Sequence, residues 1–200
     1  MSINCNENVL FISCHVTEHC EVEVKAYSSL GRRCKGRPPG FVKLNGGKVW
    51  AGSWCGKDSN HRGVNILEID PFKCRKKSFR RFDTYYGGGA PEKLRDYLKK
   101  LDKGSFIVGV TGDEPRNMLK AALPALKELG VDVHDVKFRG SFAFVAVKSY
   151  PAKTVLSKVI SPHESFKRPA YVNTIVTGIS LQILFYVVTV GCGANIYTNC

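Results

Sequence analysis

The segment from residue 104 to residue 148 constrains the fold most, because it holds three consecutive elements of regular structure. Its first part, residues 105–112, is a β-branched and apolar run that ends at glycine, which predicts a buried strand. Apolar residues then recur at helical spacing between Met118 and Leu129, and Gly130 can end that helix in a left-handed conformation. Residues 138–147 alternate apolar and small side chains, so the segment is predicted to form a strand, a helix and a strand.

The predicted helix contains two prolines. Asp113, Glu114 and Pro115 stand where its first turn is expected, since carboxylates accept hydrogen bonds from exposed amides and proline needs no donor there. Helix capping is therefore the default role for both carboxylates. Pro124 lies inside the predicted helix, where its missing N–H removes a backbone hydrogen bond and predicts a bend near Lys120.

Further elements are predicted on the N-terminal side of this segment. Residues 21–27 alternate as a strand does, and residues 41–51 have the form of a hairpin whose turn is Asn45-Gly46. Residues 63–69 and 77–83 are expected to pair as antiparallel strands. After a glycine loop, an amphipathic helix is predicted, with an apolar face formed by Leu94, Tyr97, Leu98 and Leu101.

Composition indicates one compact domain with tails, because the chain has 200 residues and 44% hydrophobic content. Lysine and arginine number 30 against 17 acidic residues, and the net charge of +13 favours anionic partners such as acidic glycans, nucleic acid or anionic lipid. Part of this charge forms a cluster that can hold phosphates or sulfates, or can protect a strand edge from pairing. The cluster consists of Lys73, Arg75, Lys76, Lys77, Arg80 and Arg81.

Eight cysteines are typical of a secreted domain with several disulfides, so an oxidising compartment is predicted. Cys55 and Cys74 flank the pair of strands at 63–83 and could form a disulfide across it, although spacing does not determine which cysteines pair. Near the N-terminus, Cys14-His15 and His19-Cys20 suit zinc chemically, but an irregular tail or a disulfide segment is the favoured interpretation.

Motifs for catalysis are absent from the sequence. It contains no HExxH, GxSxG or EF-hand pattern, and the glycines at 87–89 lack the order of a nucleotide-binding loop. The sequence therefore predicts a protein that is not an enzyme and has no cofactor or metal. Specific nucleic-acid binding is not predicted, because no zinc finger, RNP pattern or recognition-helix motif accompanies the basic charge.

Several motifs in order resemble the ILEI/PANDER-like domain family. This family includes the interleukin-like epithelial-mesenchymal transition inducer, the pancreatic-derived factor, and the stem domain of protein O-mannose N-acetylglucosaminyltransferase. The resemblance covers roughly residues 21–160 and is strongest from 62 to 148. The motifs are Arg62-Gly-Val-Asn-Ile, Arg81-Phe-Asp-Thr-Tyr85, Lys103-Gly-Ser-Phe-Ile-Val-Gly-Val110 with Asp113-Glu114, Ala125-Leu-Lys-Glu-Leu-Gly130 and Phe138-Arg-Gly-Ser-Phe-Ala-Phe-Val145.

The resemblance implies an α+β fold, an α/β sandwich of mostly antiparallel sheets with two main helices, in a single domain. It also implies an extracellular or secretory-lumen location and no catalytic activity. Two functions stay open: binding of a glycan or glycoprotein, and action as a cytokine-like ligand for a cell-surface receptor. A basic binder of nucleic acid or anionic surfaces is the outlying alternative.

Matched to the stem-domain branch, the carbohydrate-binding residues would be Arg80, Asp113 and Arg139. Guanidinium groups donate to sugar hydroxyls or an acetamide carbonyl, and a carboxylate accepts from two hydroxyls. Each residue also has a structural alternative: Arg80 as one more cation of the cluster, Asp113 as a helix cap, and Arg139 as the partner of a buried carboxylate such as Asp83.

The predicted organisation is an irregular tail at 1–20, the ILEI/PANDER-like domain at 21–160, a linker at 161–170 and an apolar tail at 171–200. This last segment has no charged residue. A transmembrane or anchor role and a β-rich tail that packs on the domain are left open as alternatives. Lys167 and Arg168 precede the run, so the positive-inside rule would place the domain in the cytosol, in conflict with the cysteine argument.

Overall fold

The computed structural model describes residues 9–14, 19–27, 40–52, 61–86, 88–115, 119–148, 153–160, 170–176 and 183–188. The chain divides into two compact units. The smaller one comprises residues 1–18 and 177–200, in which strand β1 (Val9–Cys14) pairs antiparallel with strand β11 (Ile183–Val188). The larger one runs from residue 19 to residue 176 and contains the candidate site described below.

The described residues of the larger unit form two antiparallel sheets. The four-stranded sheet has the order β10 (Ala170–Val176), β2 (Cys20–Ala26), β3 (Gly40–Leu44) and β4 (Gly47–Gly52). The five-stranded sheet has the order β6 (Arg75–Phe82), β5 (Gly63–Asp70), β7 (Phe106–Gly112), β8 (Ser141–Val147) and β9 (Lys153–Ile160). Neighbouring strands within each sheet pair antiparallel.

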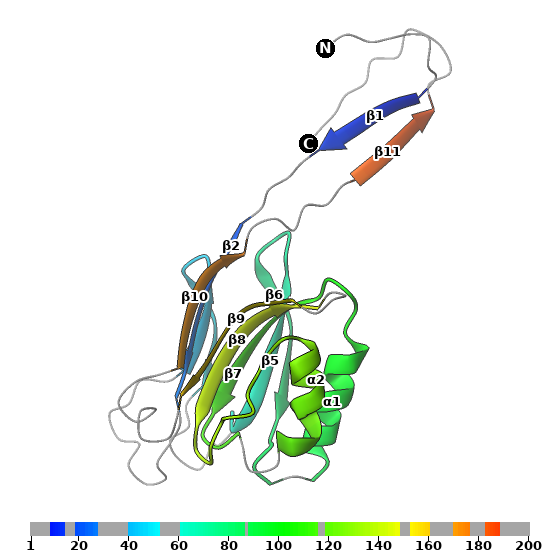
Figure 1. Ribbon diagram of the computed structural model, residues 1–200. Helices are drawn as coiled ribbons and strands as arrows, with labels where there is room; N and C mark the ends of the chain where they lie inside the picture. The colour runs from blue at the N-terminus through cyan, green and yellow to red at the C-terminus, as the bar shows by residue number, and fades with distance from the viewer. Residues whose placement is uncertain are drawn as a thin grey trace. The chain divides into compact units, whose positions relative to one another are not determined.

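The larger unit has three layers. The four-stranded sheet covers one face of the five-stranded sheet, and the helices cover the other (Figure 1). Strands β7 and β8 are therefore buried on both faces, which explains why their sequences are almost continuously apolar. Under the helices the core is built from buried side chains such as Ile66, Leu94, Leu126 and Phe144. The predicted α+β sandwich is confirmed.

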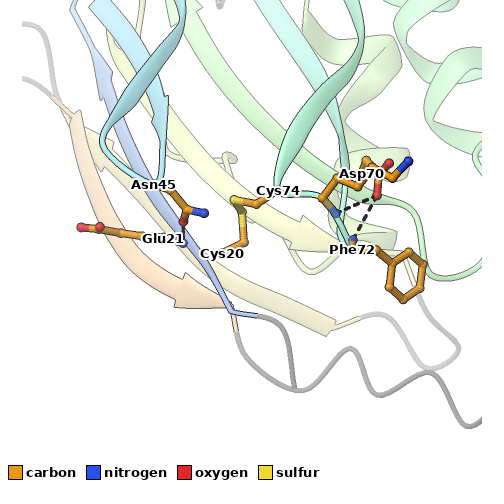
Figure 2. Close-up of a disulfide and its surroundings, with 7 residues drawn as sticks. Cys20, Glu21, Asn45, Asp70, Phe72 and Cys74 are labelled. Atoms are coloured by element: carbon orange, nitrogen blue, oxygen red, sulfur yellow. Dashed lines mark hydrogen bonds between the residues drawn. A yellow bond between two sulfur atoms is a disulfide. The ribbon is translucent and has the colours of Figure 1, made fainter. Parts of the chain in front are cut away.

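The hairpin of β3 and β4 follows directly from local sequence. Asn45 and Gly46 form its turn with φ values of 46° and 76°, which glycine adopts freely and asparagine tolerates. The side chain of Asn45 also accepts a hydrogen bond of 2.9 Å from the backbone N–H of Glu21 (Figure 2). The predicted hairpin is confirmed, and its turn is attached to the neighbouring strand β2.

The first helix, α1 (Ala90–Lys100), lies where the sequence predicts it, with Leu94 and Leu98 buried. The second predicted helix is divided into a 3₁₀ turn, η2 (Leu119–Ala122), and a short helix, α2 (Leu123–Glu128). Pro124 lies in the first turn of α2, where an N–H has no intrahelical partner. The predicted continuous helix with an internal kink is therefore wrong.

The end of α2 agrees with the sequence. Gly130 has a φ of 77°, and its N–H donates to the carbonyl oxygen of Lys127 at 2.8 Å. The N–H of Val131 donates to the carbonyl oxygen of Leu126 at 2.9 Å, so two carbonyls of the last turn have partners beyond the helix. The prediction that Gly130 ends the helix is confirmed.

A disulfide joins Cys20, the first residue of β2, to Cys74 in the turn between β5 and β6 (Figure 2). It links the two sheets, and it corrects the suggested pairing of Cys74 with Cys55, which lies outside the described residues. Cys20 is consequently not available as a zinc ligand. Among the described residues no group of three or more histidine, cysteine or acidic side chains could hold a metal ion.

The C-terminal segment contributes to the larger unit through β10, which pairs with β2 from Ala170↔Ala26 to Val176↔Cys20. The compact unit, residues 19–176, thus includes residues that were assigned to the linker and to the apolar tail as well as the predicted domain at 21–160. No helix formed by the described residues has the length and apolarity needed to cross a membrane.

Candidate functional site

Four chain segments meet at one end of the five-stranded sheet, which we call the loop end: Arg62, residues 83–86, residues 113–115 and residues 138–140. Strands β6 and β7 finish here, while β5 and β8 begin here, because the register pairs Gly63 with Gly112 and Val64 with Phe82. The hydroxyl of Thr84 donates a 2.7 Å hydrogen bond to the carbonyl oxygen of Pro115. Two of the four segments are therefore fastened to each other.

Asp113 and Arg139 form an ion pair at the loop end. The distance from Arg139 Nη1 to Asp113 Oδ1 is 3.4 Å, and the side chains are 27% and 22% exposed, respectively. Both residues have left-handed backbone conformations, with φ of 51° for Asp113 and 59° for Arg139. Such values are uncommon outside glycine, so the surrounding structure must hold these two positions in place.

Glu114 provides this support. Its side chain is fully buried, and its carboxylate accepts a hydrogen bond from the backbone N–H of Arg139. The first helical element described after β7 is η2, which begins at Leu119. Glu114 thus binds the main chain of Arg139, and Asp113 binds its side chain. Capping by either acidic residue stays a prediction, because residues 116–118 lie outside the described residues.

A second ion pair at the loop end joins Arg62 to Asp83. Arg62 Nε lies 3.0 Å from Asp83 Oδ1, and Nη2 lies 2.7 Å from Oδ2, so two parallel hydrogen bonds connect the groups. The predicted alternative that Arg139 pairs with Asp83 is wrong, because Arg62 is the arginine bound there. Burial acts to raise the pKa of Asp83, but hydrogen bonding and attraction from Arg62 outweigh it and leave that pKa below its usual value.

Arg80 is not brought to the same place. It is an exposed residue of β6, which is an edge strand in the described part of its sheet. Its register partner Ile66 pairs with Gly109 of β7. Asp113 lies four residues beyond Gly109, which corresponds to roughly 13 Å along a strand. A ligand role for Arg80 stays a prediction that would require a ligand longer than one sugar.

The basic cluster on and before β6 is partly neutralised. Lys77 Nζ lies 2.8 Å from the carboxylate of Glu68, and Arg75 Nε lies 3.8 Å from that of Asp70. Exposed charges along an edge strand discourage pairing with other chains. This agrees with the predicted role of these residues as protection of a strand edge.

Sequence inspection missed the roles of Arg62 and Glu114. In the sequence, Arg62 stands out only as the first residue of a strand motif, and Glu114 only as one of two carboxylates before a proline. A fully buried charged side chain is rare unless it has partners, so burial identifies Glu114 only after the fold is known.

Comparison with known proteins matches the same part of the chain. Cell migration-inducing and hyaluronan-binding protein from Homo sapiens is 32% identical over 113 residues, which cover 55% of this chain and 8% of that protein. Its counterpart from Mus musculus is 32% identical over 120 residues, with 58% and 8% covered. The chain thus spans less than a tenth of the length of these relatives. The model of the family described as interleukin-like EMT inducer matches residues 62–149, so this segment matches the ILEI family that its motifs predict.

Proposed function

We propose that this chain is a carbohydrate-binding module without catalytic activity of its own, acting outside the cell or in the lumen of the secretory pathway. The observation that supports it most is the pair of Asp113 and Arg139 at the loop end, which is partly exposed and held by the buried Glu114. The Cys20–Cys74 disulfide favours the oxidising compartment.

The chemistry of the pair suits sugars. A guanidinium presents five N–H donors in one plane, and a carboxylate offers about four acceptor positions. Hydroxyl groups of a sugar match both kinds of group, because a hydroxyl accepts from a guanidinium and donates to a carboxylate. Because the backbone of Arg139 is fixed by Glu114, little conformational freedom would be lost on binding.

An acidic glycan of the hyaluronan type is the ligand class that we propose. The net charge of +13 favours an anionic polymer. The two relatives are named for binding hyaluronan, although this chain corresponds to only 8% of either protein. Because hyaluronan is a polysaccharide, the names of these relatives support a glycan, and not a small molecule, as the partner of this chain.

A second candidate function is binding of a receptor protein, as the family description suggests. The outward face of the four-stranded sheet favours it, because Ile175 is 59% exposed and Tyr171 is 41% exposed on β10. Lys25 lies on the same face, with its ammonium 5.4 Å from the ring of Tyr171. Aromatic and apolar residues of this kind are common in protein interfaces.

A glycan array that includes hyaluronan fragments tests the first function with the full chain and its Arg139→Ala and Asp113→Ala variants. We expect wild-type binding to fall at least about ten-fold in each variant, the usual cost of losing a hydrogen bond to a charged group. The control is Arg95→Ala, which removes an exposed pair with Asp96 on α1 and should leave binding unchanged. Circular dichroism shows whether each variant is folded.

Three results would count against parts of this proposal. Absence of glycan binding above background by the wild type would exclude the carbohydrate function and leave the receptor alternative. Binding that survives both substitutions would exclude the site but keep the function. An affinity that falls steeply with salt concentration and is the same for different sugars would favour a general binder of anionic surfaces.

A further inference from the structure

The loop end also carries an exposed aromatic ring. Tyr86 is 73% exposed, although a tyrosine ring normally buries much of its area in a folded protein. One side of the ring is occupied, because the guanidinium carbon of Arg62 lies 4.2 Å from its centroid. Tyr85 supports the same arrangement, with its ring centroid 5.1 Å from that of Tyr86 and 4.8 Å from Arg62.

This ring is held by a rigid support. Arg62 is only 13% exposed, and its two hydrogen bonds to Asp83 fix the plane of the guanidinium. Asp83 in turn accepts a 3.3 Å hydrogen bond from the backbone N–H of Tyr85. Because Arg62 is engaged by a carboxylate and two rings, its role here is to position Tyr86.

The exposed ring suits one class of ligand. A flat aromatic surface with a hydroxyl at its edge packs against a group that is apolar on its face and polar around its rim. The ring of a pyranose has this character, since its C–H groups can gather on one face while its hydroxyls point outward. Burial of the two apolar faces would stabilise such a contact without any charge on the sugar.

The tyrosine ring and the ion pair of Asp113 and Arg139 lie at the same end of the sheet. Gly63 of β5 and Gly112 of β7 are register partners. Arg62 and Asp113 are the next residues outward from these two strands, so about one strand spacing, roughly 5 Å, is expected between their backbones. The hydrogen bond from Thr84 to Pro115 keeps the two loops together. A chain of sugars could therefore extend from the ion pair to the tyrosine ring.

We propose that Tyr86, supported by Arg62 and Asp83, is a second sugar subsite that packs on the face of a pyranose adjacent to the sugar bound by Asp113 and Arg139. This inference rests on the proposed carbohydrate function and extends it. The ligand is an oligosaccharide, and a single sugar occupies only part of the site.

The test compares two probes, a hyaluronan tetrasaccharide and free N-acetylglucosamine, in titrations of the full chain followed by NMR. We expect Tyr86→Ala to weaken tetrasaccharide binding roughly ten-fold, the scale of one aromatic contact, and to leave monosaccharide binding unchanged. Tyr86→Phe keeps the ring and should bind the tetrasaccharide within about two-fold of wild type. Arg62→Met, which removes the support, should behave like Tyr86→Ala.

Phe72, in the turn between β5 and β6 (Figure 2), provides a matched control. It is 41% exposed and lies at the opposite end of β5 from Arg62. Phe72→Ala should not alter either titration. Unchanged tetrasaccharide binding by a folded Tyr86→Ala variant would overturn the subsite while the proposed function stands. Equal losses for both probes would also overturn it, since the ring would then belong to the first sugar's site. A wild type that binds neither probe would overturn the ligand class on which both proposals depend.

Discussion

Gly63 shows at the scale of a single residue how closely the loop end is packed. Its φ is +90°, and a Cβ at this position would collide with the carbonyl oxygen of Phe82 and the backbone nitrogen of Thr84. These are main-chain atoms on the segment that carries Asp83, so they cannot turn away as the end of a side chain could. Only glycine fits at this first position of β5.

We expect Gly63→Ala to lower the free energy of unfolding by about 3 kcal/mol, from left-handed strain together with the collision. Gly104→Ala is the matched control, because Gly104 has a similar φ of +84° but open space around the added atom. It should cost only about 1 kcal/mol. Urea denaturation of the two variants measures the difference, and equal costs would show that the collision is relieved by movement of the loop.

The two ion pairs of the loop end show which contacts could not be predicted from the sequence. The resemblance to a family indicated Asp113 and Arg139, and the structure brings these two together. Spacing alone could not find this pair or that of Arg62 and Asp83, because each joins segments that become neighbours only when the sheet forms. A carboxylate before a proline is also typical of a helix start, so the contact of Glu114 with Arg139 could not be predicted, since its burial depends on the packing of the whole loop end.

At the scale of secondary-structure elements, Lys148 connects the end of β8 to the end of α1. Its ammonium donates hydrogen bonds of 2.8 Å to the carbonyl oxygen of Leu98 and 2.6 Å to that of Lys99. The last carbonyls of a helix have no partners within the helix and carry partial negative charge, so a cation there is stabilising.

Replacement of Lys148 by methionine keeps most of the side-chain length but removes both hydrogen bonds. We expect a loss of about 1 to 2 kcal/mol in the free energy of unfolding. Lys100→Met is the control, since Lys100 is an exposed residue in the last turn of the same helix, and it should change stability by less than about 0.5 kcal/mol. Thermal denaturation measures the stability of both variants. Equal losses would show that the hydrogen bonds of Lys148 to the helix end add nothing to the effect of a positive charge there.

Elements defined by local sequence were predicted well. The turn Asn45-Gly46 specifies its hairpin within a few residues, and the apolar spacing of Leu94 and Leu98 is sufficient to predict α1. The second helix was predicted incorrectly because Pro124 permits two outcomes, a kink or a new helix start. The 3₁₀ turn η2 before Pro124 allows a new helix to start there. Sequence periodicity does not distinguish such a 3₁₀ turn from an α-helical turn.

The disulfide between Cys20 and Cys74 links the two sheets of the larger unit covalently. Its residues are 54 positions apart, and closing a loop of this length in the unfolded chain corresponds to about 4 kcal/mol of stability. A double replacement of both cysteines by serine should lower the unfolding free energy by this order, as measured by chemical denaturation. Mass spectrometry of the alkylated wild type provides the control, and a reduced pair would count against the proposed oxidising compartment.

Strand pairing between β2 and β10 has a consequence for how the protein is made. The two strands come from opposite ends of the unit 19–176, so the four-stranded sheet cannot be completed until almost all of that unit has left the ribosome. Until then the open edge of β2 is available to other chains. Contacts between such distant segments also slow folding, so we expect this sheet to form after the helix-covered sheet and to be the part of the newly made chain that most needs a chaperone.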